Sequence, residues 1–260
     1  MKRPTIAIIG MGRLGTALSR RLTNAGYSVK GLSRKRRVAP VLSADVVWFC
    51  VPDGAIAGAA DSFAHFQWRD KFAFHSSGVL PSDALKSLRN AGARVASVHP
   101  LMTFVKGSVP ELNSVTFAVE GDASAVRVAR KIVRDLDGRA VAIKRRDKVA
   151  YHAFATMICP LLVSLLAASE KAAALAGMSA AESRRRMLPI IQQTLRNYKK
   201  LGPAAAFSGP IVRGDVETIR AHLKALSRAP SAKAVYIALV RAALNLLPNR
   251  NSRGLAHLTS

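Results

Sequence analysis

Acidic residues, cysteines and aromatic residues are all scarce in this sequence. Its 260 residues include 15 Asp and Glu, 2 cysteines and 6% aromatic residues. The two cysteines, Cys50 and Cys159, argue against a disulfide scaffold, and neither has a metal-like spacing to a histidine. Both lie in apolar stretches, as buried thiols of a reducing compartment do. The N-terminus also lacks the pattern of a secretory signal, so we expect a cytoplasmic protein. The spacing of the cysteines and histidines leads us to expect no metal.

The shortage of acidic residues leaves 40 Lys and Arg and a net charge of +25. Such a charge raises the question of nucleic-acid binding. The excess is spread evenly along the chain, and its basic clusters at 34–37, 144–146 and 184–186 lack interleaved aromatic residues for base stacking. We therefore expect a basic surface and no nucleic-acid partner. Nucleic-acid binding is the third-ranked hypothesis.

Residues 149–169 contain no Asp, Glu, Lys or Arg. This stretch is long enough to cross a bilayer, since about 20 apolar residues suffice. The stretch is rich in alanine and includes His152, Thr156, Pro160 and Ser164. A helix that is apolar on all sides is also typical of the centre of a helical domain. We expect a buried core helix and no membrane.

Short β-branched runs alternate with helical stretches up to about residue 145, which predicts an α/β Rossmann fold with a doubly wound, mostly parallel sheet. The expected strands are 5–9, 28–32, 45–51, 71–75, 94–98, 115–119 and 139–143. Strand patterns then end, and an all-α C-terminal domain is expected with helices at 148–177, 180–201, 215–227 and 231–247. We expect domains at 1–146 and 147–260, with a loosely held tail from residue 248.

A complete glycine motif follows the first expected strand: Gly10, Met11, Gly12, Arg13, Leu14 and Gly15. It stands between a strand and an amphipathic helix, the context in which GxGxxG binds a dinucleotide. Gly10 allows the tight turn, Gly12 lets the backbone approach a pyrophosphate, and Gly15 lets the helix pack closely on the strand. The alternative is a helix that merely begins with glycines.

The end of the second strand favours NADP(H) over NAD(H). An NAD enzyme usually carries Asp or Glu there, whereas this chain has Ser33 and Arg34 followed by further basic residues. A hydroxyl beside a guanidinium suits a ribose phosphate, which a carboxylate would repel. The alternative is a solvated basic turn.

Polar residues also follow three later strands, where ligands bind in an open α/β sheet. Val51, Pro52 and Asp53 would lie beside the cofactor, although Asp53 is also explained as a helix N-cap. Ser76 belongs to the next loop and is placed beside the cofactor too. The substrate candidates from these loops are Ser77 and Gly78, and His99 is a candidate proton donor with Ser77 as a further catalytic residue. Taken singly, such residues are also ordinary turn serines and a loop histidine.

Lys148 and His152 share one face at the start of an apolar helix, where either could act as a general acid. The alternative is a lysine that reaches water and a buried, hydrogen-bonded histidine. Arg213 is a candidate for binding a substrate carboxylate, or else a structural residue paired with Asp215.

Several stretches together resemble the DUF2520 family, bacterial oxidoreductases that join a Rossmann-like domain to a helical domain of unknown function. They are the glycine loop, 51–53, 75–78, 99–104, 151–153 and 208–215. The family resembles the superfamily of 6-phosphogluconate dehydrogenase, ketopantoate reductase, pyrroline-carboxylate reductase, hydroxyisobutyrate dehydrogenase and prephenate dehydrogenase. The prephenate branch implies a catalytic edge at Ser76 or Ser77 and His99. The hydroxyacid branch implies Lys148 as proton donor, but this chain has Cys159 and Pro160 where that branch has an Asn.

The main hypothesis is an NADPH-dependent oxidoreductase that reduces a small carbonyl or imine compound, most simply a 2-oxo acid. The resemblance makes ketopantoate the first substrate to test, and it implies a homodimer by analogy. The alternative is a non-catalytic NADP(H)-binding sensor or scaffold, which gains if Lys148, His152 and His99 do not converge.

Overall fold

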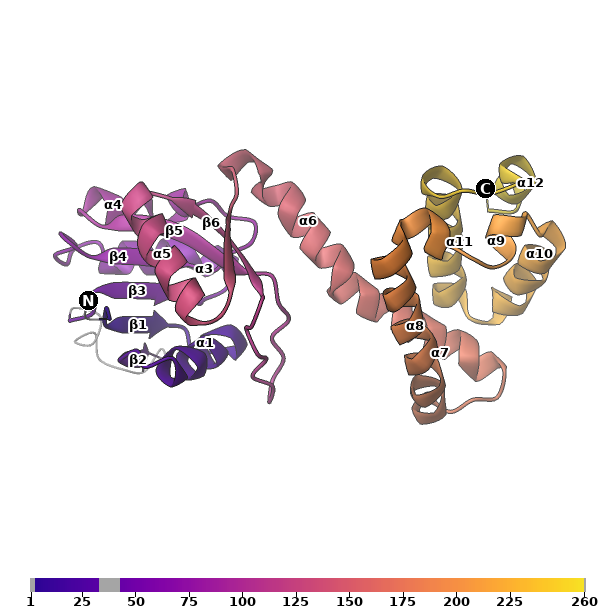
Figure 1. Ribbon diagram of the computed structural model, residues 1–260, viewed down its shortest axis with the longest axis horizontal. Helices are drawn as coiled ribbons and strands as arrows, with labels where there is room; N and C mark the ends of the chain where they lie inside the picture. The colour runs from indigo at the N-terminus through magenta and orange to yellow at the C-terminus, as the bar shows by residue number, and fades with distance from the viewer. Residues whose placement is uncertain (1–2, 33–42, 260) are drawn as a thin grey trace. The chain divides into compact units, whose positions relative to one another are not determined.

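The computed structural model describes residues 3–32 and 43–259 and divides into two compact units (Figure 1). The first unit is Met1–Ile158 and the second is Cys159–Ser260. The helix α6 (Lys148–Ile158) thus belongs to the first unit, although the strand pattern ends before it. All the residues between the glycine loop and His152 therefore lie in one compact unit.

The first unit is built on a seven-stranded sheet, which confirms the predicted doubly wound fold. The strand order is β2-β1-β3-β4-β5-β6-β7, and every neighbouring pair is parallel except β5 and β6. All seven strands lie where the sequence predicts them: β1 (Ile6–Ile9), β2 (Val29–Leu32), β3 (Val46–Phe49), β4 (Phe72–His75), β5 (Arg94–Pro100), β6 (Thr116–Gly121) and β7 (Arg139–Ala142).

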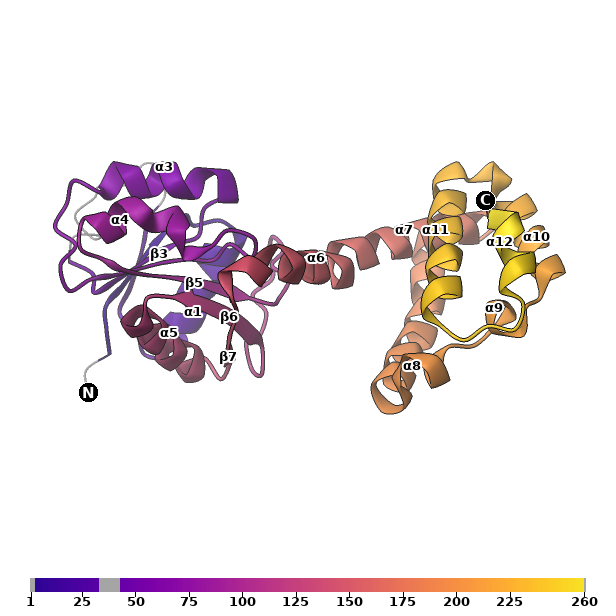
Figure 2. The ribbon, with the colours of Figure 1, turned by 90° about the horizontal axis from the view of Figure 1, so that it is seen from above.

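Helices cover both faces of this sheet (Figure 2). Helices α1 (Arg13–Asn24) and α5 (Ala123–Asp135) pack on one face, and α3 (Asp53–Phe63) and α4 (Lys86–Asn90) pack on the other. In α1, Leu18 and Leu22 are fully buried one turn apart, as the period of an amphipathic helix requires. The sheet is therefore buried on both sides, as a parallel sheet must be.

The register of the strands sets which residues meet at the carboxyl edge. Ile9 pairs with Phe49, Phe49 with His75, and His75 with Ser97. The residues that follow these four positions consequently share one edge. This edge brings the glycine loop, the loop 76–78 and His99 onto one side of the first unit.

The glycine loop holds α1 tightly against this edge. Gly10 has φ of 98°, a left-handed backbone that favours glycine. A β-carbon on Gly15 would overlap the carbonyl oxygen of Gly10, whereas one on Gly12 would meet nothing within 4 Å. Gly15 is thus required for packing, while the space above Gly12 is open to a ligand.

The second unit is all-α, as predicted, but several bounds differ. It contains α7 (Pro160–Leu175), α8 (Ala180–Ala206), α9 (Pro210–Arg213), α10 (Val216–Ala225), α11 (Pro230–Leu246) and α12 (Ser252–Thr259). The single helix expected over 148–177 is wrong, because Pro160 cannot continue α6 and instead begins α7. The loosely held tail is also wrong, since Leu255 and Thr259 of α12 are buried.

The prediction that residues 149–169 form a buried core helix is wrong for the single chain. Within the described residues, the helical stretch Arg145–Leu175 is long and apolar enough to cross a membrane, and none of its apolar window is buried. Val149 and Met157 are each 66% exposed, and Val163 is 62% exposed. Among the described residues, no element of the same unit covers any of these three side chains, so composition alone does not tell what surrounds them.

The two glycines of the loop should respond differently to an added methyl group. Gly15→Ala should lower the free energy of unfolding by about 1–3 kcal/mol, because the new β-carbon forces α1 away from Gly10. Gly12→Ala is the matched control and should unfold like the unmodified protein. Chemical denaturation followed by circular dichroism measures both. Equal stability of the two variants would contradict the close packing at Gly15.

Candidate functional site

The glycine loop presents an open, basic surface at the start of α1. Gly12 is the N-cap of α1 and is exposed, so unpaired N–H groups of the first turn are accessible. A groove of about 350 Å³ runs from Met11 and Gly12 along α1 to the segment 105–109. Its basic residues, Arg13, Arg20 and Lys106, form no ion pair with any described carboxylate. This donor set fits the pyrophosphate of a dinucleotide, since an anion would meet only positive charge and open backbone.

The other predicted cofactor residues lie near this loop or outside the described residues. Leu14 packs against the core on the α1 face, and Val51 lies directly against Gly10. Pro52, not Asp53, is the N-cap of α3, so the N-cap expected at Asp53 is wrong. The Asp53 carboxylate instead lies in the first turn of α3, where the helix dipole favours it. Ser33 and Arg34 fall outside the described residues.

The loop after β4 is fixed by its own hydrogen bonds. Nδ1 of His75 accepts from the N–H of Ser77 at 3.1 Å, and Nε2 lies 3.1 Å from the carbonyl oxygen of Pro81. A neutral ring with its hydrogen on Nε2 satisfies both contacts. The Oγ of Ser77 accepts from the N–H groups of Val79 and Leu80 at 3.2 and 2.9 Å. The loop is therefore a rigid turn, and the Ser77 hydroxyl keeps its hydrogen to donate.

Ser76 faces the interior of the sheet. Its Oγ accepts from the indole N–H of Trp48 at 2.8 Å, and its side chain is buried. Burial raises the pKa of the neighbouring Cys50 thiol to about 12, against the opposing effect of a hydrogen bond with Ser76. Cys50 is thus an unreactive thiol, and the Ser76 hydroxyl has a structural partner.

Lys148 is the first residue of α6 and has no exposed surface. Its Nζ donates to the carbonyl oxygen of Ser77 at 3.1 Å and to Oγ of Ser97 at 2.7 Å. Burial lowers the pKa of Lys148, while Glu120 and Asp53 act in the opposite direction. Among residues 3–32 and 43–259, no carboxylate forms an ion pair with it. Lys148 therefore joins α6 to the loop after β4 and to β5 through hydrogen bonds.

His99, Tyr151 and His152 gather around Gly78. A β-carbon on Gly78 would lie 2.5 Å from Cδ2 of His152 and 2.9 Å from Nε2 of His99. Nδ1 of His99 lies 3.2 Å from the hydroxyl oxygen of Tyr151. His99 lies within β5 rather than in the expected loop, because its backbone pairs with Ala118 of the antiparallel β6. Gly78 thus provides the space that lets two imidazoles from different elements come together.

Two buried imidazoles at this edge, those of His99 and His75, have pKa values below that of free histidine. Burial lowers the pKa of His99 to about 4, and the charges of Lys148 and His152 act in the same direction. Burial, then Lys148, likewise lowers the pKa of His75 to about 4. Burial raises the pKa of Tyr151. At neutral pH the site therefore combines a neutral His99 and a protonated phenol with a buried lysine.

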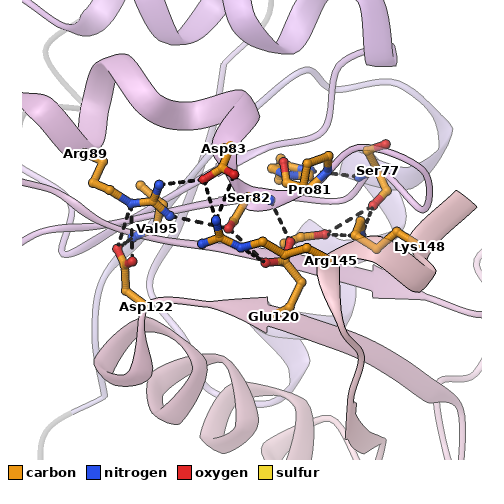
Figure 3. Close-up of polar contacts among 12 residues, drawn as sticks. Ser77, Pro81, Ser82, Asp83, Arg89, Val95, Glu120, Asp122, Arg145 and Lys148 are labelled. Carbon is orange, nitrogen blue, oxygen red and sulfur yellow. Dashed lines mark hydrogen bonds and ion pairs between the residues drawn. The ribbon is translucent and has the colours of Figure 1, made fainter.

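An ion-pair network fixes the turn before α6 (Figure 3). The carboxylate of Glu120, on β6, accepts from the N–H and Oγ of Ser82 at 2.6 and 2.9 Å. Arg145 binds Asp83 at 2.8 Å and approaches Glu120 at 3.4 Å, and Arg89 binds Asp83 at 2.7 Å. These contacts place η2 (Arg145–Asp147), and with it Lys148, against the sheet.

Arg213 lies in the second unit, at the end of α9. Its guanidinium binds the carboxylate of Asp215 through Nε at 2.9 Å and a terminal nitrogen at 2.8 Å. This is the structural pairing that the sequence left open.

Three residues of the candidate site were not predicted from the sequence. Ser97 lies two residues before His99 on the same strand, so the period of a strand could have placed it on the same face. Tyr151 lies three residues after Lys148 and shares its helix face. Glu120 had no local signal, since its role depends on the pairing of β5 with β6.

The fold is that of a Rossmann-type domain followed by a helical domain, and comparisons with known proteins agree. A family model described as a domain of unknown function, DUF2520, matches residues 115–243. No curated protein sequence matches the chain.

Solved structures similar to this chain extend over almost its whole length. A provisionally named NADP oxidoreductase from Bacteroides fragilis is 21% identical, with a TM-score of 0.78, and the match covers 92% of this chain and 97% of that one. A reductive aminase from Aspergillus terreus, solved with NADPH and ethyl levulinate, is 13% identical with a TM-score of 0.68 and full coverage of both chains. Pyrroline carboxylate reductase from Plasmodium falciparum, solved with NADP, is 15% identical with a TM-score of 0.61 and full coverage of both. At these identities the likeness establishes the fold.

The two buried imidazoles should make the stability of the protein depend on pH. Because the folded-state pKa of about 4 for His75 and His99 lies below the unfolded value of 6.5, the unfolded chain binds more protons between these values. Stability is therefore complete above about pH 6.5 and falls towards pH 4, by on the order of 3 kcal/mol for each ring. Denaturant unfolding at several pH values measures this slope.

A matched pair of variants assigns the slope to these rings. His99→Asn should flatten the dependence, whereas His65→Asn should not, since His65 is exposed and lies outside the cluster. An unchanged slope in His99→Asn would contradict a buried neutral ring.

Proposed function

We propose that this protein is an NADP(H)-dependent oxidoreductase that reduces a small carbonyl or imine compound. One observation carries the proposal. An open glycine loop and a cluster of proton-bearing side chains lie at the same carboxyl edge of one sheet. Ligands of open α/β sheets bind at this edge.

The cofactor proposal rests on the glycine loop and on the residues after β2. Gly10, Gly12 and Gly15 would hold the pyrophosphate with Met11, Arg13 and Leu14, while Val51, Pro52, Asp53 and Ser76 belong to the neighbouring loops. Ser33 and Arg34 follow Leu32, which pairs with Ile9 at the same edge. By their chemistry, a hydroxyl and a guanidinium suit a ribose phosphate. Similar structures that hold NADP or NADPH support this choice.

The substrate proposal is a 2-oxo acid, with ketopantoate as the first compound to test. The bound cofactor supplies hydride to the substrate carbon. Ser77 would orient the substrate beside Gly78, because its hydroxyl hydrogen is free to donate. The buried amino group of Lys148 would favour an anionic substrate nearby when it carries a proton. Lys148, His152 and His99 are the sequence-based candidates for delivering the proton.

The convergence of these side chains favours an enzyme over a sensor. Lys148 and His152 reach the same loop, at Ser77 and Gly78, and His99 meets it from β5. A module that only binds the nucleotide has no need of a neutral imidazole beside a phenol. We also propose that the reaction takes place in the cytoplasm.

Nucleotide binding tests the cofactor proposal. Fluorescence titration should show NADPH binding at least tenfold more tightly than NADH, and Arg34→Ala should remove this preference while leaving NADH binding unchanged. Gly12→Ala should fold normally but bind both nucleotides weakly, because its β-carbon occupies the open space above the loop. Equal affinity for both nucleotides in the unmodified protein would overturn the choice of NADP(H). No binding of either would overturn the reductase and the sensor together.

We further propose that a second copy of the chain covers the exposed apolar side chains of α6 and α7. Burial of a large aliphatic side chain contributes about 1.5–3 kcal/mol, so Val149, Met157 and Val163 together could stabilise a dimer. We prefer this partner to a membrane because His152, Thr156 and Ser164 interrupt the apolar stretch with polar side chains.

Light scattering should therefore give the mass of a dimer. Met157→Glu with Val163→Glu should yield a monomer, whereas Val141→Glu, at another exposed apolar position, on β7, should remain a dimer. A monomeric unmodified protein that floats with phospholipid vesicles would instead show that a membrane covers this surface. A monomer that does not bind vesicles would contradict both partners.

A further inference from the structure

Tyr151 forms the polar contact that links α6 to His99, although the sequence gives it no role. Its hydroxyl oxygen lies 3.2 Å from Nδ1 of His99, and the two rings meet edge to face with centroids 5.6 Å apart. In the part of the chain that the structure describes, this hydroxyl has no other hydrogen-bond partner. The Tyr151 hydroxyl thus makes one hydrogen bond, to His99, and can make a second one to a ligand.

His99 is well suited to hold a phenol in place. It lies in β5, where its backbone pairs with Ala118, and its ring is confined by Gly78 and His152. The charged and titratable groups that face it are Tyr151, His152, His75 and Lys148. Among these, the positive charge of Lys148 opposes protonation of the ring. A neutral His99 with its hydrogen on Nδ1 donates to the phenol oxygen and leaves the phenol hydrogen free.

Lys148 is less suited to deliver a proton itself. It has no exposed surface, and two of its N–H groups are already bound to Ser77 and Ser97. Tyr151 is partly exposed on the same face of α6. The same helix therefore offers a buried anchor at Lys148 and an accessible hydroxyl one turn further on.

We propose that the Tyr151 hydroxyl is the proton donor of the reductase, with His99 as its positioning residue; this rests on the proposed function. Hydride brings two electrons to the substrate carbon, and the π pair of the C=O bond moves to oxygen. That oxygen takes the hydrogen of the Tyr151 hydroxyl, and the product leaves as the alcohol. For an imine, the nitrogen takes the same hydrogen and the product is an amine. The phenolate left on Tyr151 accepts a hydrogen bond from Nδ1–H of His99 and regains its proton from solvent water.

The proton transfer is favourable with an oxo acid because an alkoxide is a much stronger base than a phenolate. Burial raises the pKa of Tyr151, which keeps the phenol protonated and available at neutral pH. The hydrogen bond from His99 stabilises the phenolate.

Steady-state kinetics of the full-length protein with NADPH and a panel of 2-oxo acids and cyclic imines tests this assignment. Tyr151→Phe should lower kcat by at least about 100-fold, the usual effect of a general acid, while the Kd for NADPH and the Tm remain close to those of the unmodified protein. Tyr236→Phe is the matched control, because Tyr236 in the second unit forms a similar edge-to-face pair with His222. Its hydroxyl oxygen lies 2.9 Å from Nδ1 of His222. Tyr236→Phe should keep its kcat.

The role of His99 has its own readout. The side-chain amide of His99→Asn can reach the Nδ1 position, so this variant should retain more kcat than His99→Ala and should shift the pH profile of kcat. Equal activity and equal pH profiles in the two variants would overturn the positioning role.

The outcomes separate this proposal from the proposed function. If the unmodified protein reduces a substrate and Tyr151→Phe keeps more than about a third of its kcat, the assignment of Tyr151 is overturned while the reductase stands. The assignment also falls if His152→Asn, and not Tyr151→Phe, abolishes the solvent isotope effect on kcat. If the unmodified protein binds NADPH but reduces no compound, the reductase function itself fails and the proton donor with it.

Discussion

The candidate site depends on the buried ammonium of Lys148. It connects the first turn of α6, the carbonyl of Ser77 in the loop after β4, and the hydroxyl of Ser97 in β5. A buried charge without a counter-ion is costly, so these hydrogen bonds must be made for the unit to fold. The same requirement places Tyr151 and His152, further along α6, against Gly78 and His99. Because one charge is anchored in this way, three elements that are distant in sequence acquire a fixed geometry.

The surrounding network explains why the ammonium tolerates its position. Glu120 lies close enough to favour the charged form of Lys148, but its oxygens are bonded to Ser82 and Arg145. Arg145 in turn fixes the turn that precedes α6 (Figure 3). The carboxylate thus acts on Lys148 over a distance rather than through an ion pair. Because Glu120 and Asp53 only partly offset the effect of burial, the pKa of Lys148 stays below its usual value.

Features set by local sequence were predictable, whereas those set by register or by partners were not. The seven strands and the glycine loop follow from short patterns that carry their own geometry, and Lys148 and His152 share a helix face by spacing alone. Ser97 and Glu120 enter the site only through the pairing of β5 with its neighbours. The tail after residue 248 is mostly polar, so its composition did not predict that Leu255 of α12 is buried. The apolar run at 149–169 predicted helical structure but neither the break at Pro160 nor what covers these side chains, because hydrophobicity indicates a preference for burial without identifying the partner.

The basic residues on the surface and the buried Lys148 at the site differ in how far solvent and salt screen them. Most of the 40 basic residues are exposed and screened by salt, so their effect on a bound ligand falls off within about 10 Å. Lys148 is shielded from solvent; burial lowers the pKa of His99 and of His75 to about 4, and Lys148 acts in the same direction, so both rings are neutral at neutral pH. A neutral imidazole can take part in a hydrogen bond with a phenol without adding a second charge. The site therefore combines a buried lysine with several neutral donors, and the proposed reduction of an oxo acid rests on this arrangement.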